Sequence, residues 1–120
     1  MKIDILGIPD RGIANKERLY LKVNMNTNLL YYLVCNSVLV ALERVSNLPR
    51  YSFWFPKKEV NAGDSVILYT KSGTDLSKSN PDGTNTHFFY WGLEKTIWNT
   101  PDDCAILFEI NSWQTSKRGS

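Results

Sequence analysis

The sequence has a single histidine, His87, and two cysteines, Cys35 and Cys104, among its 120 residues. A multi-histidine metal site cannot be built from one histidine, and the cysteines show no recognisable ligand spacing around it. We therefore expect neither a metal nor a cofactor. The two thiols could pair across two sheets in an oxidising compartment, although free thiols, which we favour, are equally common in reduced cytosolic proteins.

Neither basic nor acidic residues are in large excess: 14 basic and 12 acidic residues give a formal net charge of +2. So balanced a mixture is not by itself an electrostatic footprint for nucleic acid. Long hydrophobic runs are missing as well. The longest, residues 29–42, is interrupted by Asn36 and Ser37 and is shorter than the ~20 residues that a membrane-spanning helix needs. No membrane span is predicted.

A signal peptide is also missing from the chain as given. Met1 leads directly into KIDILGI, without a basic segment, an apolar stretch or a cleavage site. We expect a cytoplasmic protein, or one whose leader has been removed. The length fits one domain over residues 1–120, with an ordered core at about 2–115 and a short polar C-terminal tail.

Short stretches rich in β-branched and aromatic residues, bounded by glycine, proline, asparagine or aspartate, dominate the chain and predict an all-β fold. In 17–23, for example, leucine and valine alternate with polar residues and tyrosine, as a strand with one wet face requires. Seven or so strands at this spacing predict a β-sandwich. The predicted strands are residues 2–8, 17–23, 29–42, 51–55, 64–70, 86–92 and 104–110.

Some segments allow more than one interpretation. Residues 38–45 contain good helix formers, so a short helix is an alternative there. Residues 71–86 are polar and contain glycine, which predicts an exposed, mobile loop. Residues 104–110 alternate poorly, as a strand covered on both faces would. Trp98 is expected to supply a large buried face where this strand begins, and Ala105, Leu107 and Phe108 to continue into the core. Turns are expected at Gly63 and at Gly83, where glycine supplies the backbone conformation that tight turns demand.

Catalytic motifs are scarce. Glycine-rich phosphate loops and a G-x-S-x-G turn are absent, and any Ser-His-Asp constellation would have to use His87. Asp102 and Asp103 are adjacent, but neighbouring side chains in a strand point to opposite faces, so we expect them to stabilise a turn. A hydrolase or small-ligand-binding domain centred on His87 and this acidic turn is the alternative function; our main prediction is that the protein is not an enzyme.

Three blocks of the sequence resemble one family. They are ERLYLKVN at 17–24, FWFPKKEVNAGDSVILYTKSG at 53–73 and YWGLEKTIWNTPDDCAILFEI at 90–110. Together they are similar to the lamin tail domain, which occurs in nuclear lamins and as a separate bacterial module. The family's glycine before the aspartate and its leucine-glycine-tryptophan element are not found here. The resemblance implies an immunoglobulin-like β-sandwich of about seven to nine strands.

The resemblance also implies an interaction module, since lamin tail domains are associated with binding proteins and nucleic acid. Strands 51–55 and 86–92 each carry aromatic side chains on both faces, so some rings are expected to be exposed. We predict that Trp54, Lys57, Lys58 and Trp91 bind a partner, with the lysines, Arg50 and Lys71 as a small basic rim. A protein partner is favoured, nucleic acid is possible, and an edge strand could support a homodimer.

Overall fold

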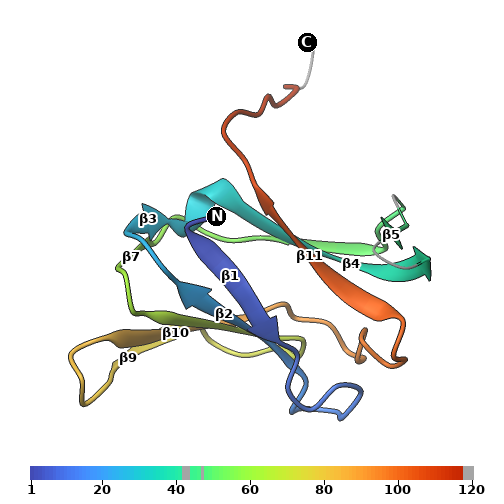
Figure 1. Ribbon diagram of the computed structural model, residues 1–120, viewed down its shortest axis with the longest axis horizontal. Coiled ribbons are helices and arrows are strands. Elements are labelled where there is room, and N and C mark those ends of the chain that lie inside the picture. The colour runs from blue at the N-terminus through green and yellow to red at the C-terminus, as the bar shows by residue number, and fades with distance from the viewer. Residues whose placement is uncertain (42–43, 47, 118–120) are drawn as a thin grey trace.

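The computed structural model describes residues 1–41, 44–46 and 48–117 and shows an almost entirely β molecule (Figure 1). One short 3₁₀ helix, η1 (Leu29–Tyr31), interrupts the strands. The strands of the described part are β1 (Ile3–Gly7), β2 (Arg18–Val23), β3 (Thr27–Asn28), β4 (Tyr32–Ala41), β5 (Arg44–Val45), β6 (Tyr51–Trp54), β7 (Glu59–Val60), β8 (Ser65–Tyr69), β9 (Leu76–Ser79), β10 (Asn85–Tyr90) and β11 (Asp103–Glu109).

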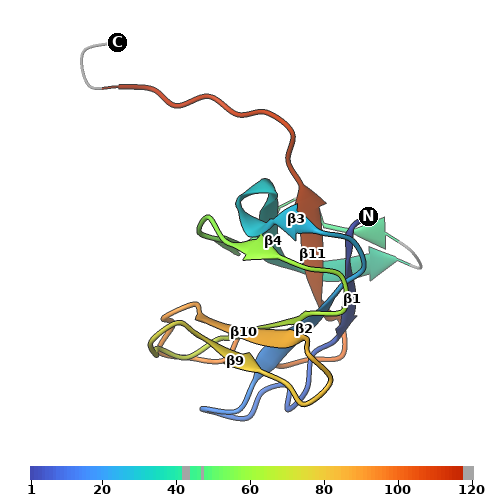
Figure 2. The same ribbon diagram turned by 90° about the vertical axis from the view of Figure 1, so that its left-hand side faces the viewer.

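Two larger sheets form the body of the molecule. One has the order β1-β2-β8-β10-β9; in the other, β4 pairs with β11 along one edge and with β6 and β5 along the other. Figure 2 shows β4 and β11 in one layer and β2, β9 and β10 in another. A small sheet of β3 and β7 lies beside them. All pairings are antiparallel except β8 with β10, which is parallel.

The core lies between the two layers because alternate residues of each strand face inward. The inward residues of β2 are fully buried, while Arg18, Tyr20 and Lys22 between them are only partly so. Trp98 enters this core from the loop before β11, as predicted from its size and place. The buried cluster is Ile3, Leu19, Leu21, Val23, Leu29, Tyr32, Val34, Phe55, Val60, Val66, Leu68, Phe89, Ile97 and Trp98.

The seven predicted strands are all present, with bounds that shift by one to three residues at most ends. The helix considered for residues 38–45 is wrong: β4 runs to Ala41 and pairs with β5, while residues 42, 43 and 47 lie outside the described chain. The β-branched side chains of Val38 and Val40 and the pairing to β11 outweigh the local helix propensity.

The prediction that residues 71–86 form a loop throughout is also wrong. It contains β9, which pairs with β10 as an antiparallel hairpin at the edge of the five-stranded sheet. The hairpin turn uses Gly83 at a positive φ of 88°, and the Asp82 carboxylate accepts hydrogen bonds from Thr84. The predicted turn at Gly63, with φ of 96°, is confirmed. A polar strand such as Leu76–Ser79 lacks the apolar alternation that would have revealed it.

Candidate functional site

The acidic turn at residues 99–103 stabilises the chain just before β11. The buried Asp103 carboxylate accepts hydrogen bonds from the backbone N–H groups of Asn99 and Thr100, each at 2.9 Å, and from Arg50 at 2.8 Å. Burial alone would raise the pKa of Asp103, but these hydrogen bonds outweigh it and lower the pKa. Asp102 is exposed. The two aspartates therefore have different surroundings, as expected for a turn.

A second buried carboxylate, Glu17, was missed by sequence reasoning. It is 1% exposed and accepts four hydrogen bonds. The donors are the backbone N–H groups of Gly12, Ile97 and Trp98 and the Thr70 hydroxyl, at 2.7–3.0 Å. In the sequence Glu17 reads as the polar start of an alternating strand, and nothing local indicates burial. Its role is to tie the loop before β11 to the five-stranded sheet.

The structure does not join His87 to the Asp102/Asp103 turn through any hydrogen bond among the described residues. His87 lies in β10 and hydrogen-bonds Asp64 at 2.9 Å and Ser77 at 2.7 Å. Asp103 instead accepts hydrogen bonds from Asn99 in its own turn and from Arg50. The hydrogen-bond partners of His87 are thus Asp64 and Ser77, and neither belongs to the acidic turn. Over the ranges the structure describes, no three histidine, cysteine or acidic side chains are grouped to hold a metal ion.

The outer face of the four-stranded sheet is largely apolar. Strand register places outward residues of β4, β6 and β11 side by side: Leu33 lies opposite both Trp54 and Phe108. Cys35, which is buried, lies opposite Ile106 and the exposed Ser52. Trp54 is 41% and Phe108 43% exposed. We call this surface the apolar face and define it by Leu33, Cys35, Trp54, Cys104, Ile106 and Phe108.

The apolar face corrects two expectations about the last strand. Residues 104–110 were expected to be covered on both sides and Phe108 to point into the core. Only Ala105 and Leu107 pack against the core, whereas Phe108 points outward. Poor alternation in this strand therefore reflects two apolar faces, one of which is left partly open to solvent.

Both cysteines are free and belong to the apolar face. Cys104 pairs in register with Ser37, and Cys35 lies two residues along the same strand, so the thiols occupy neighbouring strands of one sheet and do not bridge two sheets. Burial raises the pKa of each thiol. Because the thiolate is the reactive form, neither cysteine is an activated nucleophile at neutral pH.

Trp54 is held rigidly on the apolar face. Its indole N–H donates to the Leu30 carbonyl oxygen at 2.7 Å, and Trp113 packs edge-on against its ring at a centroid distance of 5.1 Å. Trp113, from the segment after β11, is itself 44% exposed. An aromatic side chain fixed in this way loses little conformational freedom when it contacts a partner.

The other predicted binding residues divide between two places. Lys57 and Lys58 are exposed and follow Trp54 closely in the chain. Trp91 is partly buried and packs between Phe53 and Trp98, at centroid distances of 5.8 Å, so it belongs to the core side of the molecule.

The basic rim is smaller than expected. Arg50 is paired with Asp103, and Lys71 lies over the Tyr69 ring at 4.9 Å. Tyr69 belongs to the five-stranded sheet. Of the predicted rim, Lys57 and Lys58 are the residues that follow Trp54 closely in the chain.

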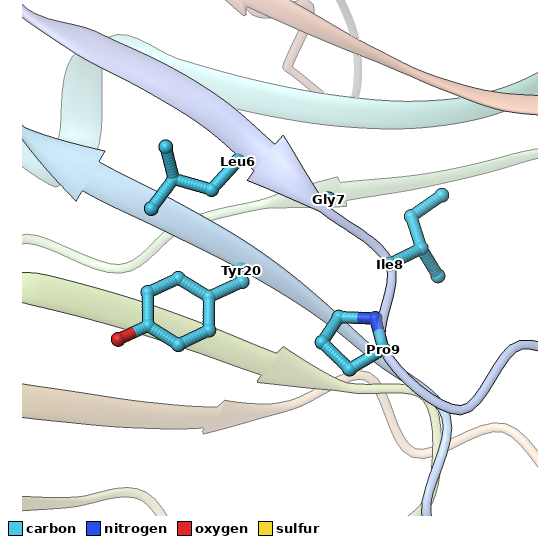
Figure 3. A pocket seen from close by; sticks show the side chains of 5 residues that line it. All are labelled: Leu6, Gly7, Ile8, Pro9 and Tyr20. Carbon is cyan, nitrogen blue, oxygen red and sulfur yellow. The ribbon is translucent and has the colours of Figure 1, made fainter.

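A depression of about 340 Å³ lies at β1 and β2, lined by Leu6, Gly7, Ile8, Pro9 and Tyr20 (Figure 3). The side chains of Leu6, Ile8 and Pro9 are apolar, and the Tyr20 hydroxyl is within 3.3 Å of the Ser65 hydroxyl. The lining supplies neither a charge nor a general base, so this surface can hold an apolar group but has no means of catalysis.

The described part of the chain contains no helix of the length and hydropathy that a bilayer crossing needs. Comparisons with protein-family models, with curated proteins and with solved structures find no match for this chain. The argument for function therefore depends on the surfaces described above.

Proposed function

We propose that this protein is an interaction module that binds a protein partner on the apolar face, with Trp54 as the central anchor. The observation that carries the proposal is an uncharged, partly exposed sheet face around an immobilised tryptophan. Contiguous exposed apolar surface on a folded protein marks contact sites, and tryptophan is enriched among the residues that dominate binding energy.

The charged residues near the apolar face indicate which kind of partner it would bind. Lys57 and Lys58 are exposed and follow Trp54 closely in the chain, and they favour a partner with acidic groups at the edge of its contact area. Trp91 is left out of the proposal because it packs in the core. Binding of this kind needs no bond-making chemistry.

The resemblance to lamin tail domains supports the same type of function. The two layered sheets are compatible with the immunoglobulin-like sandwich that the resemblance implies, and the three similar blocks include Trp54 and β11. The proposal is that this chain is a lamin-tail-like module. Since fold alone does not determine function, the apolar face carries the argument and the resemblance adds to it.

Nucleic acid and a second copy of the chain are the other partners to be tested. Nucleic-acid binding would need more free basic side chains than Lys57 and Lys58, because the phosphate backbone dominates its affinity. A second copy could pair along β11, whose only pairing in the described chain is with β4. Its sequence, DCAILFE, carries charge only at its two ends.

The partner class can be tested with the isotope-labelled chain by NMR chemical-shift titration. Short duplex and single-stranded DNA are added at low and at near-physiological salt, and the chain alone is measured over a concentration series. We expect no salt-sensitive DNA shifts near Trp54, Lys57 and Lys58. Such shifts would replace the protein partner with nucleic acid, and concentration-dependent shifts on β11 would identify a second copy as the partner.

A further inference from the structure

Ser77, His87 and Asp64 form a continuous hydrogen-bonded series that the apolar face does not use. The Ser77 hydroxyl lies 2.7 Å from His87 Nδ1, and His87 Nε2 lies 2.9 Å from an Asp64 carboxylate oxygen. Asp64 and His87 are 1% and 4% exposed, whereas Ser77 lies on the exposed edge strand β9. A buried acid, a buried imidazole and an accessible hydroxyl are thus arranged in sequence.

The protonation states follow from the partners of Asp64. Besides His87, it accepts the backbone N–H groups of Asn61 at 3.0 Å and Asn85 at 2.9 Å. Burial would raise the pKa of Asp64, but the bonds from Asn61, His87 and Asn85 outweigh it and lower the pKa. The ionised carboxylate only accepts, so Nε2 donates to Asp64, and in the neutral form of the ring Nδ1 is free to accept the Ser77 O–H.

We propose that Ser77 is a nucleophile activated by His87 and that it takes an acyl group from a small ester. Asp64 acts as a positioning residue that holds the imidazole in the tautomer with Nδ1 free to accept a proton. A hydroxyl bonded to an imidazole that is in turn bonded to a carboxylate is the arrangement that activates serine in unrelated hydrolases, where geometry matters and order in the chain does not.

The surface beside Ser77 has room for such a substrate. A pocket of about 240 Å³ opens there, with Leu76, Phe88 and Phe89 as its apolar part. Its lining also holds one acid, Asp75, and one cation, Lys58, that can stabilise a developing negative charge on the carbonyl oxygen. Its size suits an ester of a short carboxylic acid. The lining residues are Lys58, Asp75, Leu76, Ser77, Phe88 and Phe89.

The chemical step balances with the groups present. Ser77 Oγ forms a bond to the ester carbonyl carbon while its proton passes to His87 Nδ1. The bond from that carbon to the alcohol oxygen then breaks, and the departing alcohol takes the proton from His87. Water returns the serine to its free form by the same path, releasing the carboxylic acid.

This activity goes beyond partner binding. Ser77 lies in β9, His87 in β10 and Asp64 in the turn just before β8, whereas the apolar face belongs to β4, β6 and β11. Lys58 is the residue that the two proposals share. It also differs from the hydrolase alternative drawn from the sequence, since the acid is Asp64 and neither Asp102 nor Asp103 takes part.

The test uses a fluorophosphonate probe, which phosphorylates activated serines, and locates the label by mass spectrometry. Ser79 is a matched comparison because it is exposed on the same strand, and Ser79→Ala is the control variant. We expect labelling at Ser77 well above that at Ser79, because the imidazole of His87 takes the proton of the Ser77 hydroxyl. Ser77→Ala should lower total labelling about 100-fold, the lower bound for general-base assistance, and Ser79→Ala should leave it unchanged.

One result would overturn the proposal. Labelling of Ser77 at no more than the level of Ser79 would show that the hydroxyl is not activated. The measurement uses the intact chain, so the outcome does not depend on whether a variant of the buried His87 folds. Hydrolysis of 4-nitrophenyl acetate, lost in Ser77→Ala, would then confirm turnover.

Discussion

The loop at residues 96–103 and the apolar face both depart from the usual pattern of buried apolar and exposed charged side chains. The loop has buried acids at its base, where Glu17 and Asp103 between them accept four of its backbone N–H groups. The apolar face leaves Trp54 and Phe108 partly in water although neither carries a charge. The two regions adjoin, because Asp103 is the first residue of β11.

The difference separates what stabilises the fold from what remains for a partner. A buried carboxylate costs desolvation free energy, which is offset only where every acceptor position is used, so such a group is retained for structure. An exposed aromatic side chain contributes less to folding than a buried one and can gain further burial on binding. Substitutions in the loop should therefore lower stability, and substitutions on the apolar face should mainly lower binding.

The largest effect is expected from Glu17→Gln. Each carboxylate oxygen of Glu17 accepts a hydrogen bond from at least one backbone N–H. In glutamine one of these oxygens is replaced by an NH₂ group, which cannot accept and would face a backbone N–H. We expect the free energy of unfolding to fall by about 3–5 kcal/mol, measured by urea titration. Glu94→Gln, at an exposed position, is the control. A decrease in the free energy of unfolding below about 1 kcal/mol for Glu17→Gln would contradict the structural role of Glu17.

The next effect is acid sensitivity. The pKa values of Asp64 and Asp103 are lowered from an ordinary 3.8, so their contribution is present above that value and is lost as pH falls through the lower folded-state values. We expect the urea midpoint to drop steeply below about pH 4. Asp103→Asn should flatten this drop, while exposed Asp102→Asn should not; equal slopes in the two variants would contradict the account.

A smaller effect is expected at alkaline pH. Burial, with the hydrogen bond to Glu109, raises the pKa of Tyr32 from 10.0 to about 12. A raised pKa means that stability is complete below pH 10 and falls as pH rises toward 12, by roughly 2–3 kcal/mol in all. Urea midpoints across this range should show the loss, and Tyr32→Phe should lack this component. An unchanged alkaline slope in that variant would refute the assignment.

The smallest effect on stability is expected from Trp113→Ala. Trp113 comes after the last strand and is placed edge-on against Trp54, a pair worth about 1 kcal/mol. We expect a loss of that size in urea titration, together with a change in the fluorescence of Trp54. A decrease in the free energy of unfolding above about 3 kcal/mol would show that the apolar face is part of the core. It would then contradict the distinction between the stabilising loop and the apolar face.

The sequence was sufficient for the seven apolar strands, because alternating apolar and polar residues report burial directly, but not for the polar strand β9. It also indicated the turns at Gly63 and Gly83 and the outward position of Trp54. It was not sufficient for Glu17, whose partners Ile97 and Trp98 lie far away in the chain. Contacts of this kind depend on which strands become neighbours, and no local pattern encodes that.

The site residues show the same limit. Trp91 and Trp54 look alike in the sequence, each in a strand with aromatic side chains on both faces, yet one lies in the core and the other on the surface. The series from Ser77 to Asp64 depends on β9, whose polar sequence resembles a loop. Its register with β10 places Ser77 opposite His87, and only the folded sheet reveals that pairing.

The most direct test of the account is quantitative affinity capture from an extract of the cells that make the protein, comparing the wild-type chain with Trp54→Ala and Tyr90→Ala. Tyr90 is the matched control, an aromatic residue that stacks on Tyr69 in the five-stranded sheet. We expect a partner that the wild-type and Tyr90→Ala chains retain and that Trp54→Ala loses at least tenfold. Equal recovery by all three chains, or loss with Tyr90→Ala alone, would contradict the claim that the apolar face is the binding surface.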